Sequence, residues 1–585
     1  MRRFLAGTTV IALLTAACAA GPGRPARTPG APACDPRMDA AFTAWAAAGF
    51  SGSIAILKDG AFECRAAYGM ADAAARRPNT PETVFSIGSV TKAVTAAAIL
   101  RLADEGKLSL DDRVGKILPQ LRGPVAEAKV RQLLLHTSGL NGTHGDDYER
   151  LSPDEALAAI GRLKLAFPPG TGYVYSNSGY TLLALVVEHL SGRGYRGYLG
   201  SAVLRLPGGR VAGGFWDGRP AAPGPRAVGY LDDGRPGHQG GFSGPYWGLE
   251  GNGGLAMSTP DLASWTHALF TGQVVTPASA ALAARPGWPL GDGRSETPGW
   301  VAYDPSLYGE RFLSAAGGGG DVGHNTVVAW VPAQRRAVAI ASNTASNTAS
   351  NTAGITAEAL LKAVGPALLA GRPLPRPPAA ARGGDLGAIV GTYRLDGGGR
   401  FQVAAEGGKL TVSAAGADAV RALTSPGEGG TESGGTESGG TESGGTESGS
   451  TGAALRAHEQ RVLALLNGQT QEGRRERASL EKAFGAVSGL SLAGTITQGA
   501  DTRTYVVLTT GKGPVLGWYA VNDQGGVQAA EVPAKPPALT FVPSGAGRFR
   551  PDDPTGAGPR VEIAFEGRRM TLTGARGAAV AERSG

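Results

Sequence analysis

The feature that most constrains the fold is a pair of apolar hairpin patterns that lie far apart in the chain. The first pattern joins residues 53–58 and 61–68, and the second joins 326–331 and 337–341. Apolar runs on both sides of a short polar turn are typical of antiparallel hairpins. These two pairs of strands, with helices between them in the chain, predict one antiparallel sheet packed against a helical lobe. We expect a cleft where the two meet. The helical patterns cover residues 89–105, 152–163, 181–190 and 260–270.

The 585 residues are too many for one hydrophobic core, so the chain is expected to contain several domains. We assign the α+β domain to residues 36–365 and a Pro-rich linker to residues 366–384. Short strand patterns then predict a C-terminal β-rich, barrel-like module at residues 385–585. An α+β insert at about residues 452–533 interrupts this module, and the Gly-Gly-Thr-Glu-Ser repeat at residues 429–448 has a composition typical of disorder.

The N-terminus has the pattern of an export signal. Residues 1–18 combine a basic start with a short apolar run and end on Cys18, which small residues precede. We therefore expect a lipoprotein-type signal peptide with Cys18 as the lipidated residue, and simple cleavage nearby is the alternative. Residues 19–35 have the composition of a flexible tether. The mature protein is then expected to be exported and lipid-anchored, facing the periplasm or the cell exterior.

Two cysteines remain in the mature chain, Cys34 and Cys64. An even pair in an oxidising compartment favours a disulfide, which chain-entropy arithmetic values at roughly 3 to 4 kcal/mol. Two free, partly buried thiols are the alternative. Neither cysteine is accompanied by the histidine of a cysteine-nucleophile signature.

Charge and composition exclude several function classes. The net charge is +7, and the arginines are scattered with no run of five or more basic residues, which argues against nucleic-acid binding. The seven histidines form neither an HExxH nor an HxH pattern, so no metal site is expected. No cofactor is expected either. The absence of a GxSxG motif argues against an α/β-hydrolase.

The octapeptide FSIGSVTK, residues 85–92, places a serine three residues before a lysine at the start of a helical pattern. Residues i and i+3 share one face of a helix, so Lys92 can help to remove the proton of Ser89. The helix N-terminus favours a developing oxyanion at the same place.

A second SxxK, formed by Ser479 and Lys482, lies in a strongly charged stretch and is interpreted as a solvated helix face.

Two further segments are candidates for the same site. Tyr175 and Asn177 flank Ser176 at the start of a helix, where a tyrosine near Lys92 could have a lowered pKa and act first as base and then as acid. Asn177 could hold the acyl side chain or Lys92, whereas a structural Tyr-Asn turn is the alternative. The glycine run at residues 317–320 precedes a strand and would let a substrate approach closely. The individual glycines proposed for this oxyanion and substrate strand are Gly317, Gly319 and Gly320.

The backbone N–H of Gly320 is the candidate for a second oxyanion donor beside that of Ser89. A flexible surface loop is the alternative interpretation of the run.

These segments resemble the serine β-lactamase and penicillin-binding-protein superfamily, in its class C β-lactamase-related branch of S12-type serine hydrolases. In that branch SxxK, YxN and a KTG-like triplet occur in this order. The resemblance covers roughly residues 40–355 and includes the ancillary segments 106–114, 132–140 and 253–259. It implies a β-lactamase/transpeptidase-like fold. It also implies that Ser89 is the acylated nucleophile, that Lys92 and Tyr175 are its proton-transfer partners, and that Asn177 completes the second motif.

The third motif departs from the family pattern. Many relatives carry Lys or His followed by x-Gly, whereas this chain aligns Gly317-Gly318-Gly319 there. The basic group that would meet a substrate carboxylate is therefore missing. His324 lies seven residues further on and is a candidate replacement, with a structural role as the alternative.

The sequence therefore predicts an exported serine hydrolase that acts on D-amino-acid peptides, β-lactams or esters. A catalytically weak or inactive penicillin-binding or sensor protein of the same fold is the alternative. We expect a small-molecule or peptidoglycan-derived substrate, no nucleic acid, and a membrane contact only through the lipid anchor. The oligomeric state stays open, as does the choice of lid, wall-binding module or spacer for the C-terminal region.

Overall fold

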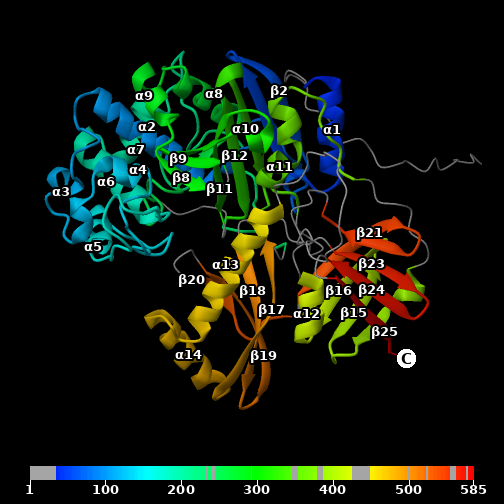
Figure 1. Cartoon of the computed structure of the whole chain (residues 1–585). Helices are drawn as coiled ribbons and strands as arrows, with labels where there is room; N and C mark the ends of the chain where they lie inside the picture. The colour runs from blue at the N-terminus through cyan, green and yellow to red at the C-terminus, as the bar shows by residue number, and fades with distance from the viewer. Residues whose placement is uncertain are drawn as a thin grey trace, which may run out of the picture.

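An eight-stranded antiparallel sheet forms the centre of the first domain in the computed structural model (Figure 1). Its strands are β1 (Gly52–Lys58), β2 (Ala61–Tyr68), β8 (Trp288–Gly291), β9 (Arg294–Thr297), β10 (Trp300–Tyr303), β11 (Phe312–Gly319), β12 (His324–Val331) and β13 (Arg336–Ser342). They run in the order β2-β1-β13-β12-β11-β10-β9-β8. The two hairpins expected from the sequence thus lie next to each other, with Gly52 opposite Ser342 and Lys58 opposite Arg336. The predicted fold class is confirmed.

The structure describes residues 34–231, 234–238, 244–291, 293–319, 322–344, 354–378, 386–424, 448–498, 501–521, 525–535, 537–553, 561–574 and 577–584. The expected signal peptide, Cys18, Gly320 and all of the glycine-rich repeat except Ser448 lie outside these residues. None of the helices in the described part of the chain has the length and apolar character that a membrane span requires.

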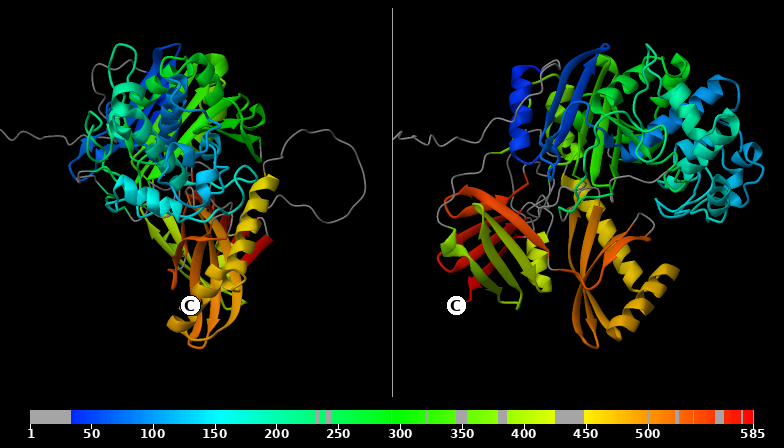
Figure 2. Two further views of the ribbon diagram at one scale, coloured as in Figure 1. Left: turned by 90° about the vertical axis from the view of Figure 1, so that its left-hand side faces the viewer. Right: turned by 180° about the vertical axis from the view of Figure 1, so that it is seen from behind.

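The sheet is buried on both faces because its central strands send apolar side chains into two separate cores. Val328 and Trp330 of β12 face one core, whereas Val327 and Val331 face the other. This alternation follows from the two-residue period of a strand. In the right-hand view of Figure 2, α1 and the helical lobe lie on opposite sides of the sheet. The first core includes α2 (Thr91–Asp104) and α8 (Thr259–Phe270), and the second includes α1 (Pro36–Ala47) and α11 (Ala357–Leu369).

The helical lobe lies between the two hairpins in the chain, as expected. The other helices of this domain are α3 (Val114–Ile117), α4 (Val130–Leu134), α5 (Pro153–Gly161), α6 (Asn177–Ser191), α7 (Tyr195–Tyr198), α9 (Pro277–Ala283) and α10 (Pro305–Tyr308). Its short strands are β3 (Met70–Asp72), β4 (Arg77–Pro78), β5 (Phe85–Ser86), β6 (Gly214–Phe215) and β7 (Leu255–Met257). β5, β7 and β6 form a small sheet of their own in that order.

Helix α6 begins one turn earlier than the apolar periodicity predicts. The Ser176 hydroxyl accepts a hydrogen bond from the Gly179 N–H at 3.1 Å and so caps the helix. At the other end Gly192 has φ 67°, the left-handed conformation that commonly ends helices. The early start makes Asn177 the first helical residue, directly after the tyrosine and serine of the YxN motif.

Cys34 and Cys64 form a disulfide that ties the start of α1 to β2. Both cysteines are buried in the core behind the sheet. Replacing both by serine is expected to lower the free energy of unfolding by about 3 to 4 kcal/mol, because the unfolded chain regains the freedom of a long closed loop. Urea unfolding followed by tryptophan fluorescence measures the loss.

A reductant should move the wild-type unfolding midpoint toward that of the double variant and leave the variant itself unchanged. Equal wild-type midpoints with and without reductant would contradict the expected contribution of the disulfide.

The C-terminal region contains a closed eight-stranded barrel, as the strand patterns indicated. Its interior is filled by aromatic and aliphatic side chains, among them Tyr393, Phe401, Phe541 and Met570. Helix α12 adds Val420 and Leu423 to this core. The barrel consists of β14 (Gly391–Leu395), β15 (Arg400–Glu406), β16 (Lys409–Ala415), β21 (Ala538–Gly545), β22 (Arg548–Pro551), β23 (Glu562–Glu566), β24 (Arg569–Gly574) and β25 (Gly577–Arg583), and α12 spans Ala417–Thr424.

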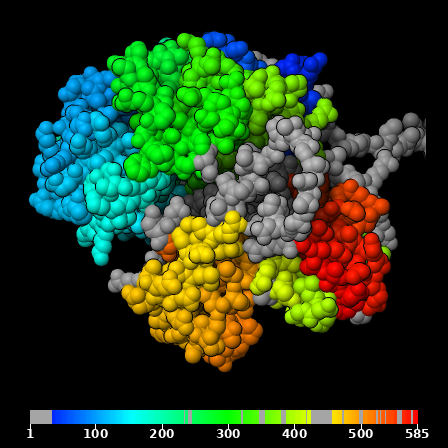
Figure 3. All heavy atoms as spheres, viewed as in Figure 1, coloured from blue at the N-terminus to red at the C-terminus, as the bar shows by residue number. Residues whose placement is uncertain are grey.

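An α+β insert separates β16 from β21 in the chain. It contains α13 (Ser448–Leu466), α14 (Gln471–Phe484), β17 (Val487–Gln498), β18 (Asp501–Thr510), β19 (Gly513–Val521) and β20 (Val527–Glu531). The four strands form one sheet in sequence order, and α13 and α14 pack against it around a small core of their own. In Figures 1 and 3 the insert and the barrel lie side by side below the first domain.

Candidate active site

Ser89 lies in a turn of 3-10 helix, Gly88–Val90, between β5 and α2. Gly88 has φ 48°, which a glycine adopts without strain and which directs the chain from the strand into the turn. The rest of α2 is almost entirely buried, so the serine is fixed at the end of a rigid core helix. Its side chain stays partly accessible and lines a pocket.

Lys92 is the first close partner of this serine. Its Nζ lies 2.9 Å from Ser89 Oγ and donates to the Asn252 carbonyl at 3.0 Å. The side chain is only 4% exposed. Burial lowers the pKa of Lys92 to about 7, although the negative charges of Asp147 and Glu296 oppose this effect. A lysine with this pKa carries a large fraction of neutral amine at neutral pH and can accept a proton.

Tyr175 is the second partner, since its hydroxyl donates to Ser89 Oγ at 2.9 Å. Lys92 Nζ lies 4.8 Å from the centre of the same ring. The expected lowering of the tyrosine pKa is wrong. Burial of the hydroxyl raises the pKa of Tyr175, and the hydrogen bond to Ser89 only partly offsets it. The pKa of Tyr175 rises less than it would for a fully buried tyrosine, because 49% of the side chain is exposed to solvent.

The physical reason for this correction is burial, and Lys92, with a pKa of about 7, has already lost its charge at the pH where a phenol ionises. The ammonium group lies over the face of the ring, while the phenol oxygen points to the serine. A neutral phenol at this place is a proton donor, so the structure favours Lys92 as base and Tyr175 as acid.

His136, which the sequence analysis left without a role, holds the YxN segment. Its ring packs at a tilt against that of Tyr175, with 4.5 Å between ring centres, and its Nδ1 accepts the Ser176 N–H at 3.0 Å. Burial and the nearby charge of Lys92 hold the pKa of His136 well below its usual value. The ring therefore stays neutral and keeps its acceptor nitrogen. Its position inside the family-like segment 132–140 was the signal that could have identified it.

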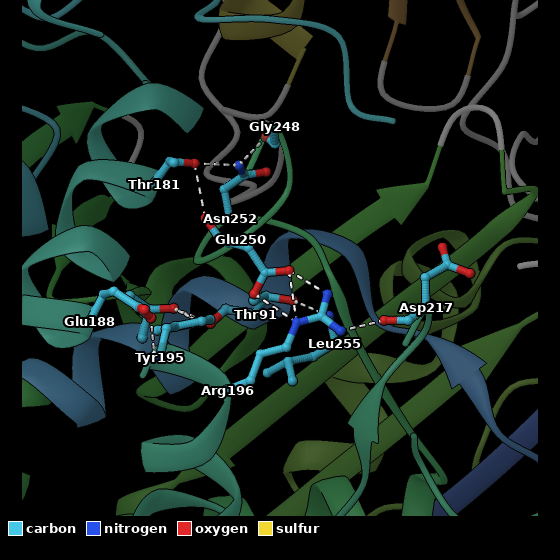
Figure 4. A network of polar contacts seen from close by, with 11 residues as sticks. Thr91, Thr181, Glu188, Tyr195, Arg196, Asp217, Gly248, Glu250, Asn252 and Leu255 are labelled. Atoms are coloured by element: carbon cyan, nitrogen blue, oxygen red, sulfur yellow. Dashed lines mark hydrogen bonds and ion pairs between the residues drawn. The ribbon is translucent and has the colours of Figure 1, made fainter. Parts of the chain in front are cut away.

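Asn252 is a second residue that sequence reasoning missed. Its carbonyl accepts from Lys92, and its side-chain Nδ2 donates to Thr181 Oγ1 at 2.9 Å and to the Gly248 carbonyl at 2.8 Å (Figure 4). Thr181 in turn donates to the Glu250 carbonyl at 2.9 Å. The loop before β7 is thus fastened to α6 by side-chain hydrogen bonds. The Asn252 carbonyl thus holds Lys92, which is the role that the sequence suggested for Asn177.

A buried ion pair supports the same loop. Arg196 of α7 binds the Glu250 carboxylate through two of its nitrogens and also donates to the Asp217 carbonyl (Figure 4). Glu250 is 1% exposed, so this charge is stabilised by a bidentate partner rather than by water. Asn177, by contrast, is exposed and lines the pocket, where it can contact a bound molecule.

The glycines of the third motif lie on β11, directly against the nucleophile. A Cβ atom at Gly317 would lie 2.3 Å from the Ser89 nitrogen and 2.4 Å from the Ile87 carbonyl oxygen. No side chain fits at Gly317. This position therefore lacks the basic residue of the family motif and also the space for one. Gly318 lines the pocket and Gly319 pairs with His324 of β12. The proposed oxyanion donor Gly320 lies outside the described residues.

His324 does not replace the missing base. The side chain is fully buried, and its Nδ1 accepts the Ser86 N–H at 2.9 Å. Burial lowers the pKa of His324 to about 3, so the ring is neutral at physiological pH. Its role is structural, because it fastens β5 to β12 next to the nucleophile.

The pocket beside Ser89 has a volume of about 100 Å³ and opens to solvent. Aromatic rings and carboxylates form much of its wall. Within the described residues, no group of three or more potential metal ligands is gathered. The pocket residues with these side chains are Asp147, Tyr148, Trp216, Asp217, Tyr246 and Glu250.

The second SxxK lies in α14 of the C-terminal insert. Ser479 and Lys482 are both exposed there, as the charged sequence around them indicated. The two SxxK motifs therefore differ in function although their spacing is identical. Of the two serines, only Ser89 has a buried lysine and a tyrosine within hydrogen-bond distance of its hydroxyl.

Comparisons with known proteins identify the family of the chain. A family model described as beta-lactamase matches residues 39–363. Esterase EstB of Burkholderia gladioli is 36% identical over 163 residues, which cover 24% of this chain and 41% of the esterase. Protein flp of Staphylococcus aureus is 32% identical over 161 residues, covering 26% of this chain and 32% of flp. The matches therefore span less than half the length of these curated relatives.

Among solved structures, the octameric penicillin-binding protein homologue from Pyrococcus abyssi matches with a TM-score of 0.52 and 21% identity. The match covers 93% of this chain and 99% of that one, so the likeness in fold extends over the C-terminal region.

Proposed function

The chain belongs to the beta-lactamase family, and from that premise we propose that it is an exported serine hydrolase that forms an acyl-enzyme at Ser89. The observation that carries the proposal is the convergence of Lys92 and Tyr175 on one hydroxyl, each at 2.9 Å. A nucleophile, a base and an acid within hydrogen-bond reach are what acyl transfer requires.

In the proposed acylation step the neutral amine of Lys92 takes the proton of Ser89 as Oγ attacks the substrate carbonyl. The backbone N–H of Ser89, in the 3-10 turn that precedes α2, is one donor for the oxyanion that develops. Tyr175 then gives its proton to the leaving group, and Lys92 returns a proton to the phenolate. Water cleaves the acyl-enzyme by the reverse sequence, which restores the Ser89 hydroxyl.

Among the substrate classes, esters are favoured over β-lactams and D-alanyl peptides. β-Lactams and D-alanyl peptides usually present a carboxylate to the enzyme. At Gly317 there is no cation to bind it and no space for a basic side chain. A charge-assisted hydrogen bond contributes about 1.5 to 3 kcal/mol, so its absence corresponds to roughly 10- to 100-fold in kcat/KM.

A panel of p-nitrophenyl esters, nitrocefin and D-alanyl peptides on the purified protein tests this proposal. We expect the esters to be turned over with the highest kcat/KM. Turnover of none of the compounds would favour the second candidate, a binding or sensor protein of the same fold, for which the loss at Gly317 is the supporting observation. Faster turnover of D-alanyl peptides would overturn the substrate assignment.

We further propose that the protein is exported and held at the membrane by a lipid on Cys18. The support is the pattern of residues 1–18, with its basic start, short apolar run and small residues before the cysteine. Metabolic labelling with palmitate should mark the wild type, and a Cys18→Ser variant that labels equally would contradict the anchor.

The pH dependence of the reaction follows from Lys92. Only the neutral amine can take the serine proton, and the pKa of Lys92 is about 7. The kcat/KM for p-nitrophenyl acetate is therefore expected to fall about tenfold per pH unit below pH 7 and to level off above it. Rates corrected for spontaneous hydrolysis between pH 5 and pH 9 measure this profile. A flat profile across that range would exclude Lys92 as the base.

A further inference from the structure

A buried carboxylate is hydrogen-bonded to the segment just before the YxN motif and has no part in the chemistry proposed so far. Glu296 belongs to β9 and is only 5% exposed. Its Oε2 accepts a hydrogen bond from the Tyr173 hydroxyl at 2.9 Å. A carboxylate removed from water is costly unless hydrogen bonds or positive charge compensate it, so its position next to the active site requires an explanation.

The titratable groups around Glu296 come from the elements that carry the catalytic residues. Burial raises the pKa of Glu296 to about 7, while the Tyr173 hydrogen bond and the charge of Lys92 oppose the increase. The negative charge of Glu296 acts in return on the lysine and on two phenols of the site. The groups concerned are Lys92 of α2, Tyr173 and Tyr175 of the segment before α6, and Tyr180 of α6.

Within the described part of the chain, two carboxylates act on the charge of Lys92. Asp147 is the other carboxylate that acts on it, and His136 beside it is held neutral. The rings of Tyr175 and Tyr180 also lie near the amine, with centres 4.8 and 5.8 Å from Nζ. In such a dry environment a single carboxylate has a large influence on whether the amine is protonated.

Glu296 also connects to Tyr175 through the backbone. Tyr173 lies two residues before Tyr175, and both rings contact His136, with centres at 6.0 and 4.5 Å. The hydrogen bond from Tyr173 to Glu296 therefore fastens the start of the YxN segment to the sheet.

We propose that Glu296 is a positioning residue of the acylation step, which anchors Tyr173 at the start of the YxN segment and adds a buried negative charge to the surroundings of Lys92. The proposal rests on the function proposed above, since it concerns the base of that reaction. In the resting site Lys92 donates toward Ser89 with the Glu296 charge nearby. Loss of that proton gives the active amine. Burial lowers the pH at which this happens, and the charges of Asp147 and Glu296 raise it.

Glu296→Gln tests the charge with little change in shape, because the amide oxygen can still accept from Tyr173. The titration of Lys92 is read directly from its ε-carbon by NMR, with the lysines ¹³C-labelled at Cε and the signal assigned by its absence in Lys92→Arg. We expect the midpoint of Lys92 to fall by about 0.5 to 1 pH unit in Glu296→Gln, because an opposite charge that favours the ammonium form is removed. The acid limb of kcat/KM for p-nitrophenyl acetate should move down by the same amount.

Tyr173→Phe is the second variant and keeps the carboxylate. Without the hydrogen bond Glu296 protonates more readily, so the midpoint of Lys92 should fall in the same direction but by less. A purely structural role for Glu296 would lower thermal stability in either variant and leave both midpoints in place.

The outcomes separate the two proposals. Unchanged Lys92 midpoints in Glu296→Gln and Tyr173→Phe would overturn the role of Glu296, even if the wild type hydrolyses esters. A lowered midpoint without any hydrolysis would support the role of Glu296 and count against the proposed function instead. Should Glu296→Gln fail to fold, the direction of the shift in Tyr173→Phe decides.

Discussion

Ser89→Ala is expected to lower kcat for p-nitrophenyl acetate by about 10⁴-fold or more, because loss of the nucleophile leaves only binding and oxyanion stabilisation. The variant should fold as the wild type does, since the serine side chain is partly accessible and only its oxygen is lost. Steady-state hydrolysis measured beside the circular dichroism spectrum and melting temperature checks both expectations.

The chain supplies a matched control for this substitution. Ser479→Ala removes the serine of the second SxxK, which is exposed on α14. It should leave kcat and kcat/KM within experimental error of the wild type. Equal activity of Ser89→Ala and wild type, or a loss of activity in Ser479→Ala, would contradict the assignment of the nucleophile.

Gly317→Ala is expected to produce the second large effect, although the residue carries no functional group. Its new Cβ would lie 2.3 Å from the Ser89 nitrogen, a distance at which either β11 or the nucleophile turn must move. A displacement of about 1 Å at reacting atoms costs about 100-fold in rate, and overpacking of this kind typically destabilises by about 1 to 3 kcal/mol. Both kcat/KM and the melting temperature should therefore fall.

Gly318→Ala is the control for this steric argument. Among the described residues, a Cβ at Gly318 would meet only Asn325 Nδ2, at the ordinary contact distance of 3.7 Å. We expect this variant to keep the wild-type melting temperature and the rate at which a small fluorophosphonate acylates Ser89. Similar losses in the two variants would show that β11 does not pack on the nucleophile as described.

The sequence was sufficient to predict those parts of the fold and site that depend on local pattern. The hairpins around Asp59-Gly60 and after Val331 were recognisable because apolar runs flank polar turns. Ser89 and Lys92 were recognisable because helix geometry places residues i and i+3 on one face. The antiparallel sheet and helical lobe followed from the order of these segments.

Residues that act through tertiary contacts could not be found in this way. Asn252 contributes a backbone carbonyl to Lys92, and a backbone carbonyl has no sequence signal. Nothing in the sequence distinguishes Glu296 from the other acidic residues, because its contact with Tyr173 forms only when the sheet is folded. The pKa of Tyr175 was predicted in the wrong direction because burial, which the sequence does not show, raises it and the hydrogen bond to Ser89 only partly offsets this increase.

The C-terminal region shows the same limit on a larger scale. Its strand patterns predicted a barrel-like module, but β16 pairs with β21 across the whole insert. Pairings between strands so far apart in the chain depend on how the barrel closes rather than on any local pattern.

Reaction of the protein with a fluorophosphonate probe, followed by mass spectrometry of the intact chain and of its peptides, tests the central claim most directly. The Ser89 oxygen should displace fluoride from phosphorus, with Lys92 taking the proton, and give one adduct per chain on the peptide that contains Ser89. The adduct should be absent from Ser89→Ala. An adduct on another residue, or equal labelling of Ser89→Ala, would contradict the claim that this serine is an activated nucleophile.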